Sequence, residues 1–119
     1  MEGLLETALL YDFYGELLTQ HQREIFEDYS LSDLSLGEIA QNRGVSRQAV
    51  HDIIRRCRRQ LEAYEEKLHL VGKFLEIKEA LTQIDACAGQ LAADPGLSQE
   101  SAENVLKIRR LAGAITQEL

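Results

Sequence analysis

Four side chains that can contact the edges of base pairs lie within six residues of one another: Arg47, Gln48, His51 and Asp52. In the major groove of DNA, arginine can form two hydrogen bonds to guanine and glutamine can form two to adenine. Ser46 stands directly before them as a candidate N-cap, and the free backbone N–H groups of such a helix start suit a phosphate. We therefore predict nucleic-acid contacts at the start of a helix that follows Ser46.

Arginines are concentrated around these four residues. Residues 41–60 contain six arginines and one acidic residue, so this segment carries +5 while the other 99 residues carry −12. Phosphate binding depends on the local basic face more than on the net charge of −7. Besides Arg47, these arginines are candidates for contacts to the nucleic-acid backbone, which give affinity without sequence information. They are Arg43, Arg55, Arg56, Arg58 and Arg59.

The elements that must position these side chains are two short helices joined by a tight turn, over residues 35–56. Ser35 and Glu38 have the spacing of a capping box, so the first helix should begin at Leu36. Gly44 falls where the residue after a helix often needs a positive φ. A helix-turn-helix also needs a small residue where the helices cross and apolar residues on the inner faces. The matching positions are Leu36, Ile39, Ala40, Val45, Val50, Ile53 and Ile54.

Two further helices are expected before the helix-turn-helix. Residues 4–18 are apolar on nearly every side, which is typical of a helix buried between others. Thr19 and Gln22 have the spacing of another capping box, which begins a helix that should run to about Tyr29. The aromatic side chains of the first helix are expected in the core: Tyr11, Phe13 and Tyr14.

After Ser46 a helical pattern continues for more than 40 residues, with apolar residues alternately four and three apart. The apolar stripe changes phase at residues 71–73, so we expect a bend or break near Gly72. A turn at residues 94–96 and an N-cap at Ser98 then precede the last helix.

The sequence thus predicts an all-α fold of about six helices and no strand. We divide it into a helix-turn-helix unit, residues 1–70, and a helical extension, residues 71–119, that serves packing or dimerisation. The leucine-rich stripes of the extension must be buried against the first unit or against a second copy of the chain. A homodimer is expected, since two recognition helices could then reach half-sites about 34 Å apart. The pattern does not decide which stripe forms the contact.

Catalysis, metal binding, a cofactor and membrane insertion are not expected. The three histidines, His21, His51 and His69, match no metal-binding spacing, and glycine-rich phosphate loops and nucleophile motifs are absent. Cys57 and Cys87 lie 30 residues apart and are expected to be buried, reduced thiols. No apolar run approaches about 20 residues and no signal-peptide pattern is present. We therefore expect a cytoplasmic protein that is not an enzyme.

Four motifs together resemble a known family. They are DFYG at residues 12–15, LTQHQRE at 18–24, LSLGEIA at 34–40 and GVSRQAV at 44–50. The segment 17–68 resembles the fourth conserved region of sigma factors. With the preceding LLYDFYGELLT it is most similar to the YlxM family, small helical proteins encoded beside the signal recognition particle GTPase in bacteria. The resemblance covers about residues 4–70, and His51 departs from the tyrosine expected in the family pattern.

The resemblance implies a bacterial regulatory protein linked to the signal recognition particle pathway, and two hypotheses follow. The first is a DNA-binding regulator that reads its site through Arg47, Gln48 and His51. The second is an adaptor that binds the particle's RNA or its GTPase through the same basic face or the C-terminal stripes. Structured RNA also presents phosphates to arginines, although its deep and narrow major groove does not admit a helix.

Overall fold

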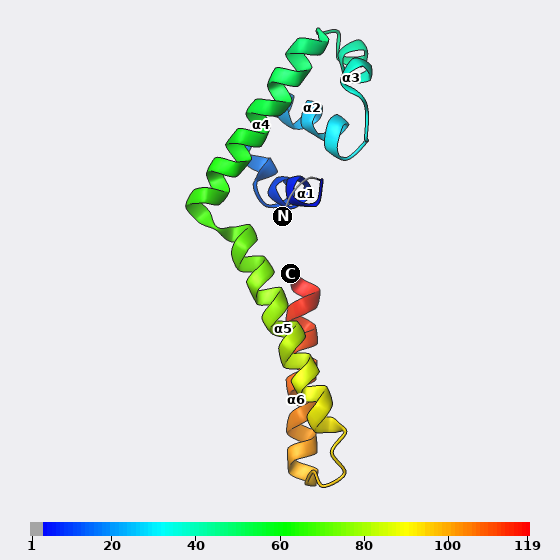
Figure 1. The fold of residues 1–119 in the computed structure, drawn as a ribbon, viewed down its shortest axis with the longest axis vertical. Coiled ribbons are helices and arrows are strands. Elements are labelled where there is room, and N and C mark those ends of the chain that lie inside the picture. Colours follow the sequence, from blue (N-terminus) through cyan, green and yellow to red (C-terminus); the bar gives the residue numbers. More distant parts are fainter. Residues whose placement is uncertain (1–3) are drawn as a thin grey trace. The chain divides into compact units, whose positions relative to one another are not determined.

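The computed structural model describes residues 4–119, and this part of the chain forms six α-helices, one short 3-10 helix and no strand (Figure 1). The all-α prediction with about six helices is confirmed. The elements are α1 (Leu4–Tyr14), η1 (Gly15–Leu17), α2 (Gln20–Ser30), α3 (Leu36–Arg43), α4 (Arg47–Leu68), α5 (Leu70–Ala92) and α6 (Gln99–Glu118). The chain divides into two compact units between Val71 and Gly72.

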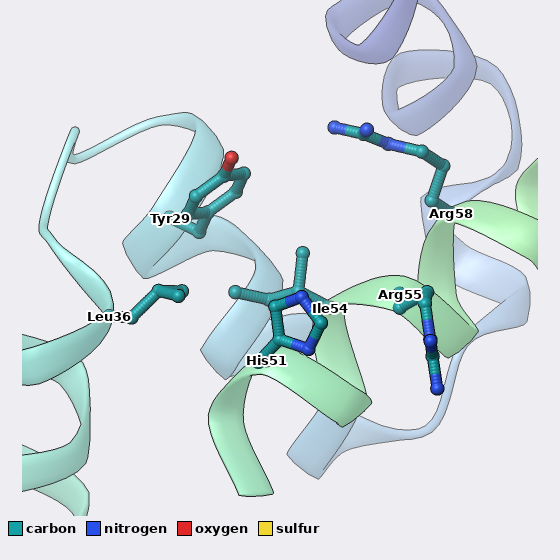
Figure 2. A pocket seen from close by; sticks show the side chains of 6 residues that line it. All are labelled: Tyr29, Leu36, His51, Ile54, Arg55 and Arg58. Carbon is teal, nitrogen blue, oxygen red and sulfur yellow. The ribbon is translucent and has the colours of Figure 1, made fainter. Parts of the chain in front are cut away.

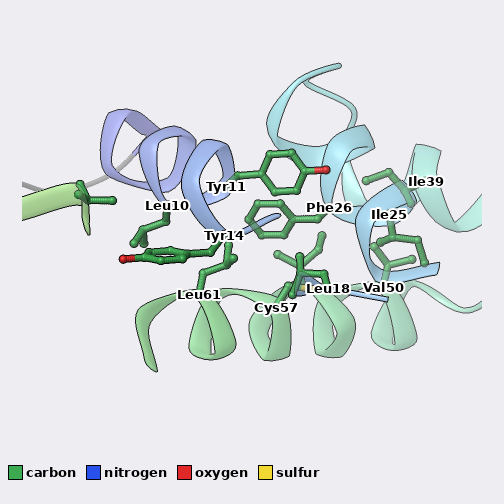
Figure 3. Close-up of a cluster of buried hydrophobic side chains, with 12 residues drawn as sticks. Leu10, Tyr11, Tyr14, Leu18, Ile25, Phe26, Ile39, Val50, Cys57 and Leu61 are labelled. Carbon is green, nitrogen blue, oxygen red and sulfur yellow. The ribbon is translucent and has the colours of Figure 1, made fainter. Parts of the chain in front are cut away.

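The core of the first unit is built on one face of α4, against which α1, α2 and α3 all pack (Figure 3). Val50, Cys57 and Leu61 are fully buried along that face. On the opposite side of the core, the ring of Tyr11 from α1 stacks on Phe26 from α2, with centroids 5.5 Å apart. Each large side chain buried in this way stabilises the fold by about 1.5–3 kcal/mol, so the core holds α3 and α4 firmly together.

The expected N-caps are present. Gln22 donates its backbone N–H to Thr19 Oγ1 at 3.2 Å, and Thr19 donates to Gln22 Oε1 at 3.0 Å. Ser35 and Glu38 form the same reciprocal pair at the start of α3. Each capping box satisfies two backbone N–H groups that a helix start would leave unpaired, which is why α2 and α3 begin where the sequence predicted.

The first helix is shorter than predicted and is not buried on every side. It ends at Tyr14, and the next three residues tighten into η1. The ring of Tyr11 lies so close to Gly15 that a Cβ there would be 2.8 Å from it, so the chain turns where glycine permits the approach. Tyr11 and Tyr14 are in the core as expected, whereas Phe13 is 37% exposed and its expected burial was wrong.

The break in the long helical segment lies at His69, three residues before the expected Gly72. His69 adopts a left-handed conformation with φ of 57°, and Gly72 lies within α5. The backbone N–H of the first residue of α5 donates to Tyr14 Oη at 3.1 Å, and that of the second donates to a Glu65 carboxylate oxygen at 2.9 Å. These hydrogen bonds to Tyr14 and Glu65 fix the residue at which α5 begins. The change of phase in the apolar stripe does not predict them, because it carries no information about contacts to distant residues.

The second unit, Gly72–Leu119, consists of the rest of α5 and α6, which runs back beside it (Figure 1). The expected turn is present: Gly96 donates its backbone N–H to the Asp94 carboxylate at 2.9 Å. Ser98 then caps α6, as predicted. Four side chains are buried between the two helices: Leu81, Ala88, Val105 and Ala112.

Cys87 corrects the sequence prediction, because its side chain is exposed on α5 while Cys57 is buried. Both cysteines are free thiols. No helix within residues 4–119 is long and apolar enough to cross a membrane.

Candidate nucleic-acid interface

The turn before α4 fixes the direction in which this helix leaves the core. Gly44 has φ of +69° at the end of α3, as the sequence predicted, and Val45 donates its backbone N–H to Ala40 O at 3.1 Å. The Ser46 side chain then accepts the backbone N–H of Ala49 at 3.0 Å. Since both the turn and the cap are satisfied, the first turn of α4 is held in one orientation.

A row of basic side chains runs along one exposed side of α4. Arg47, His51, Arg55 and Arg58 are separated by four, four and three residues, a spacing that keeps them on one side of a helix. The row extends about 16 Å at 1.5 Å per residue. Among the residues that the structure describes, Arg47 and Arg58 take part in no hydrogen bond or ion pair. Their guanidinium groups are therefore available to an anionic partner.

A pocket of about 250 Å³ lies beside this row (Figure 2). Its apolar side chains are Leu36 of α3 and Ile54 of α4, with the ring of Tyr29 from α2 across from them. Arg55 and Arg58 lie along its edge with their guanidinium groups pointing apart. A second hollow, lined by Leu36, Arg47, Gln48 and His51, continues from it towards the start of α4. This side of α4 thus offers an apolar surface with a basic border.

Asp52 holds Gln48 in the free protein. Gln48 Nε2 donates to Asp52 Oδ1 at 3.1 Å. The same carboxylate oxygen lies 3.8 Å from Arg55 Nη2 and 3.7 Å from His51 Nδ1. The four residues expected to contact base edges are thus brought together on the first turns of α4, but contact to a base by Gln48 requires it to leave Asp52.

Arg56 and Arg59 are exposed on other sides of α4 and make no hydrogen bond or ion pair within residues 4–119. Arg43 differs from them. Its guanidinium donates to both carboxylate oxygens of Asp28, at 2.9 and 3.1 Å, and lies 3.9 Å from Glu24. The hydrogen bond to Asp28 raises the pKa of Arg43. The structure therefore gives Arg43 the role of tying α3 to α2, in place of the free cation that the sequence suggested.

Cys57 lies under this surface and offers no chemistry to it. Burial raises the pKa of its thiol to about 11, so the thiol stays protonated at neutral pH. No group of three or more metal-binding side chains occurs among residues 4–119.

Comparison with known proteins agrees with this architecture. Residues 1–95 match the family model UPF0122, described as "Putative helix-turn-helix protein, YlxM / p13 like". The chain belongs to the UPF0122 family. The YlxM resemblance seen in the sequence motifs is thereby confirmed.

Relatives of the UPF0122 protein extend over most of the chain. A UPF0122 protein of Caldanaerobacter subterraneus subsp. tengcongensis is 51% identical over 86 residues, which cover 72% of this chain and 74% of that protein. A UPF0122 protein of Desulforamulus reducens is 43% identical over 108 residues, covering 90% of this chain and 92% of that one. A third, from Bacillus velezensis, is 51% identical over 91 residues, or 76% and 83% of the two chains.

Two residues of the UPF0122 interface were missed by reasoning from the sequence. Tyr29 was expected as the approximate end of a helix, yet its ring lines the pocket. Asp28 was not recognised as the partner of Arg43, which is 15 residues away on another helix. A local pattern carries no signal for either placement, because each depends on how α2 crosses α3 and α4.

Proposed function

We propose that this UPF0122 protein is a DNA-binding regulator of the sigma region four type, acting in the bacterial cytoplasm with α4 in the major groove. The observation that carries the proposal is the exposed basic row on α4, Arg47 to Arg58, on a helix whose other face is buried in the core. A helix held in this way can be presented to DNA without loss of its own packing.

The dimensions of α4 suit such a contact. The major groove is about 12 Å wide, which is less than the roughly 16 Å length of the row. When Arg47, Gln48 and His51 contact base edges within the groove, Arg55 and Arg58 fall near the phosphates at its border. The Asp52 carboxylate could accept a hydrogen bond from the amino group of cytosine. Arg56, Arg59 and the N-cap Ser46 supply further backbone contacts.

The distribution of charge supports binding through this side alone. The residues outside 41–60 carry −12, and they repel the phosphate backbone. We further propose that the protein acts as a homodimer, with its two α4 helices on half-sites about 34 Å apart.

The test is the salt dependence of binding to a fluorescent duplex, measured by anisotropy. Four phosphate contacts per protomer, from Arg55, Arg56, Arg58 and Arg59, predict a log–log slope of about −3.6 per protomer. Arg58→Ala should weaken binding to every duplex and reduce the slope by about 0.9 per protomer. Arg110→Ala, an exposed arginine of α6, is the matched control and should leave both unchanged. A flat slope contradicts the proposal.

The readout of sequence is tested separately. Arg47→Ala should lower the preference for the selected site over a scrambled duplex, by an amount equivalent to about 1–3 kcal/mol. Equal affinity of the wild type for both duplexes would show that α4 contacts phosphates only.

A second candidate function is an adaptor on the RNA or GTPase of the signal recognition particle. The pocket favours it, because the Tyr29 and His51 rings beside two arginines offer a stacking surface for an unpaired base. Competition between a DNA duplex and the particle RNA for the purified protein separates the two functions. Displacement of RNA by duplex at comparable concentrations supports the DNA-binding regulator, and RNA binding that duplex does not displace supports the adaptor.

A further inference from the structure

The α5–α6 hairpin carries two regular apolar rows, and only half of each is buried within the hairpin. On α5, Leu81 and Ala88 are buried against α6. On α6, Val105 and Ala112 are buried against α5. The other apolar positions of the same four-three spacing remain about half exposed. They are Ile77 (46%), Ile84 (46%), Leu91 (51%), Ile108 (43%) and Ile115 (47%), and they are called the isoleucine face below.

The isoleucine face is a single surface shared by both helices. A groove of about 420 Å³ is lined by Ile84, Cys87 and Leu91 of α5 together with Ile108 of α6. None of the side chains that line it is charged. The opposite surface of the hairpin is polar, with Thr82, Asp85 and Thr116 around another hollow, and Asp85 is paired there with Arg109 at 3.1 Å. The groove of the isoleucine face is therefore uncharged, whereas the hollow on the opposite side contains a carboxylate.

Helices with this spacing complete their packing in a bundle of four. In such bundles both sets of apolar positions on each helix face a core that all four helices share. Here the buried positions already pack within the hairpin. The residues of the isoleucine face have the spacing to pack against a second pair of helices. The two helices also bury only four side chains between them, and small units bury a smaller fraction of their surface than large ones.

We propose that the isoleucine face packs against the same face of a second copy of this chain, forming a four-helix bundle. The inference deepens the homodimer of the proposed function by naming its surface. A face about 30 Å long and two helices wide covers roughly 600 Å², close to the roughly 800 Å² that each partner buries in a standard interface. A two-fold axis brings each isoleucine row against its equivalent, and no charge is buried.

The decisive experiment is sedimentation equilibrium of the full chain without nucleic acid, so that a failure of DNA binding does not affect the result. Wild-type protein should have twice the chain mass of 13.4 kDa. Ile84→Lys should reduce the mass to that of one chain, and Ile108→Lys on the other helix should do the same. Thr82→Lys, which places the same charge on the polar side of α5, is the matched control and should remain a dimer.

Cys87 provides an independent readout, because it lies in the groove and is exposed in the single chain, whereas Cys57 is buried. Its rate of labelling by a thiol reagent should fall at least tenfold as the wild-type concentration rises through the dissociation constant. In Ile84→Lys the rate should stay constant. The isoleucine face is excluded as the interface if both lysine variants remain dimeric.

A monomeric wild type overturns the inference whatever the labelling shows. If Cys87 is protected from the thiol reagent in that monomer, another part of the same chain covers the isoleucine face. If Cys87 reacts, the isoleucine face is exposed to solvent. Sequence-preferring DNA binding by a monomeric wild type would overturn the dimer and leave the DNA-binding proposal standing.

Discussion

At the scale of single residues, Asp52 governs the charge of the proposed interface. It is the one acidic residue of segment 41–60. In the free protein its carboxylate accepts a hydrogen bond from Gln48 and lies near Arg55. These contacts restrain two of the side chains proposed to meet DNA, and the carboxylate itself repels phosphate. In the proposed complex, Asp52 would therefore lower the affinity for DNA and raise the selectivity between sequences.

We expect Asp52→Asn to bind a scrambled duplex about threefold more tightly and the selected site by less, because one repulsion at about 6 Å in water, roughly 0.7 kcal/mol, is removed from both. Discrimination between the selected site and a scrambled duplex should fall, since an amide no longer only accepts hydrogen bonds. Anisotropy titrations of both duplexes measure the two effects. Glu103→Gln on α6 is the control, and weaker binding by Asp52→Asn would contradict this role.

Arg43 shows the limit of residue-level prediction from sequence. Its type and position beside Gly44 match those of a phosphate-binding residue, and five of the six arginines of segment 41–60 are indeed exposed without a close hydrogen-bond partner. The sixth is held by two bonds to Asp28. Charge counts locate a basic segment, but only the crossing of α2 and α3 shows which cation is already neutralised.

At the scale of elements, the turn at Gly44 sets the angle between α3 and α4. Its φ of +69° lies in the left-handed region, and a Cβ there would meet no atom within 4 Å. The requirement is therefore for backbone conformation and not for space. Gly44→Ala should lower the free energy of unfolding by about 1–2 kcal/mol, measured by urea denaturation. Gly44→Asn, which tolerates this conformation better, should lose less; equal losses would indicate a steric cause.

The helix boundaries that could be predicted are those set by local chemistry. The capping boxes at Thr19 and Ser35 act within four residues, so the sequence alone locates them. The end of α4 could not be predicted, because Tyr14 and Glu65, which fix it, are 51 residues apart. The exposure of Cys87 was missed for a related reason: the phase of an apolar stripe does not say how much of it a partner helix covers.

The joint between α4 and α5 rests on the Tyr14 hydroxyl, which donates to Glu65 at 2.5 Å and accepts the first N–H of α5. Burial and the hydrogen bond to Glu65 raise the pKa of Tyr14, which keeps this donor protonated. Tyr14→Phe should therefore lower the free energy of unfolding by about 1–3 kcal/mol. Tyr29→Phe removes a hydroxyl without such partners and should cost little. Similar losses in the two variants would refute the role of the joint.

At the scale of the whole molecule, DNA binding is proposed for the first unit, through the basic row, and dimerisation for the second, through the isoleucine face. The first unit presents one α4 helix, whose contacts span only a few base pairs. The second unit contains no concentrated basic segment, but it has an apolar surface that a second copy can cover. The proposed dimer would thus double the phosphate contacts without adding a charge to either unit.

This arrangement predicts the form of the DNA site. Selection from random duplexes by the wild type should return the same short motif twice, with inverted symmetry, because a two-fold dimer presents identical helices. The centres of the two copies should lie about one helical turn apart or a multiple of it. Inserting five base pairs moves one copy to the opposite side of the duplex and should weaken binding at least tenfold.

Comparison of the wild type with Ile84→Lys, which is expected to be monomeric, tests whether the inverted repeat depends on dimerisation. It keeps all residues of the basic row, so it should select a single copy of the same motif and should not respond to the five-base-pair insertion. Its salt slope should be about half that of the wild-type dimer, since half as many phosphates are contacted. A single motif selected by a wild type that is dimeric in solution would show instead that only one α4 helix reaches the DNA.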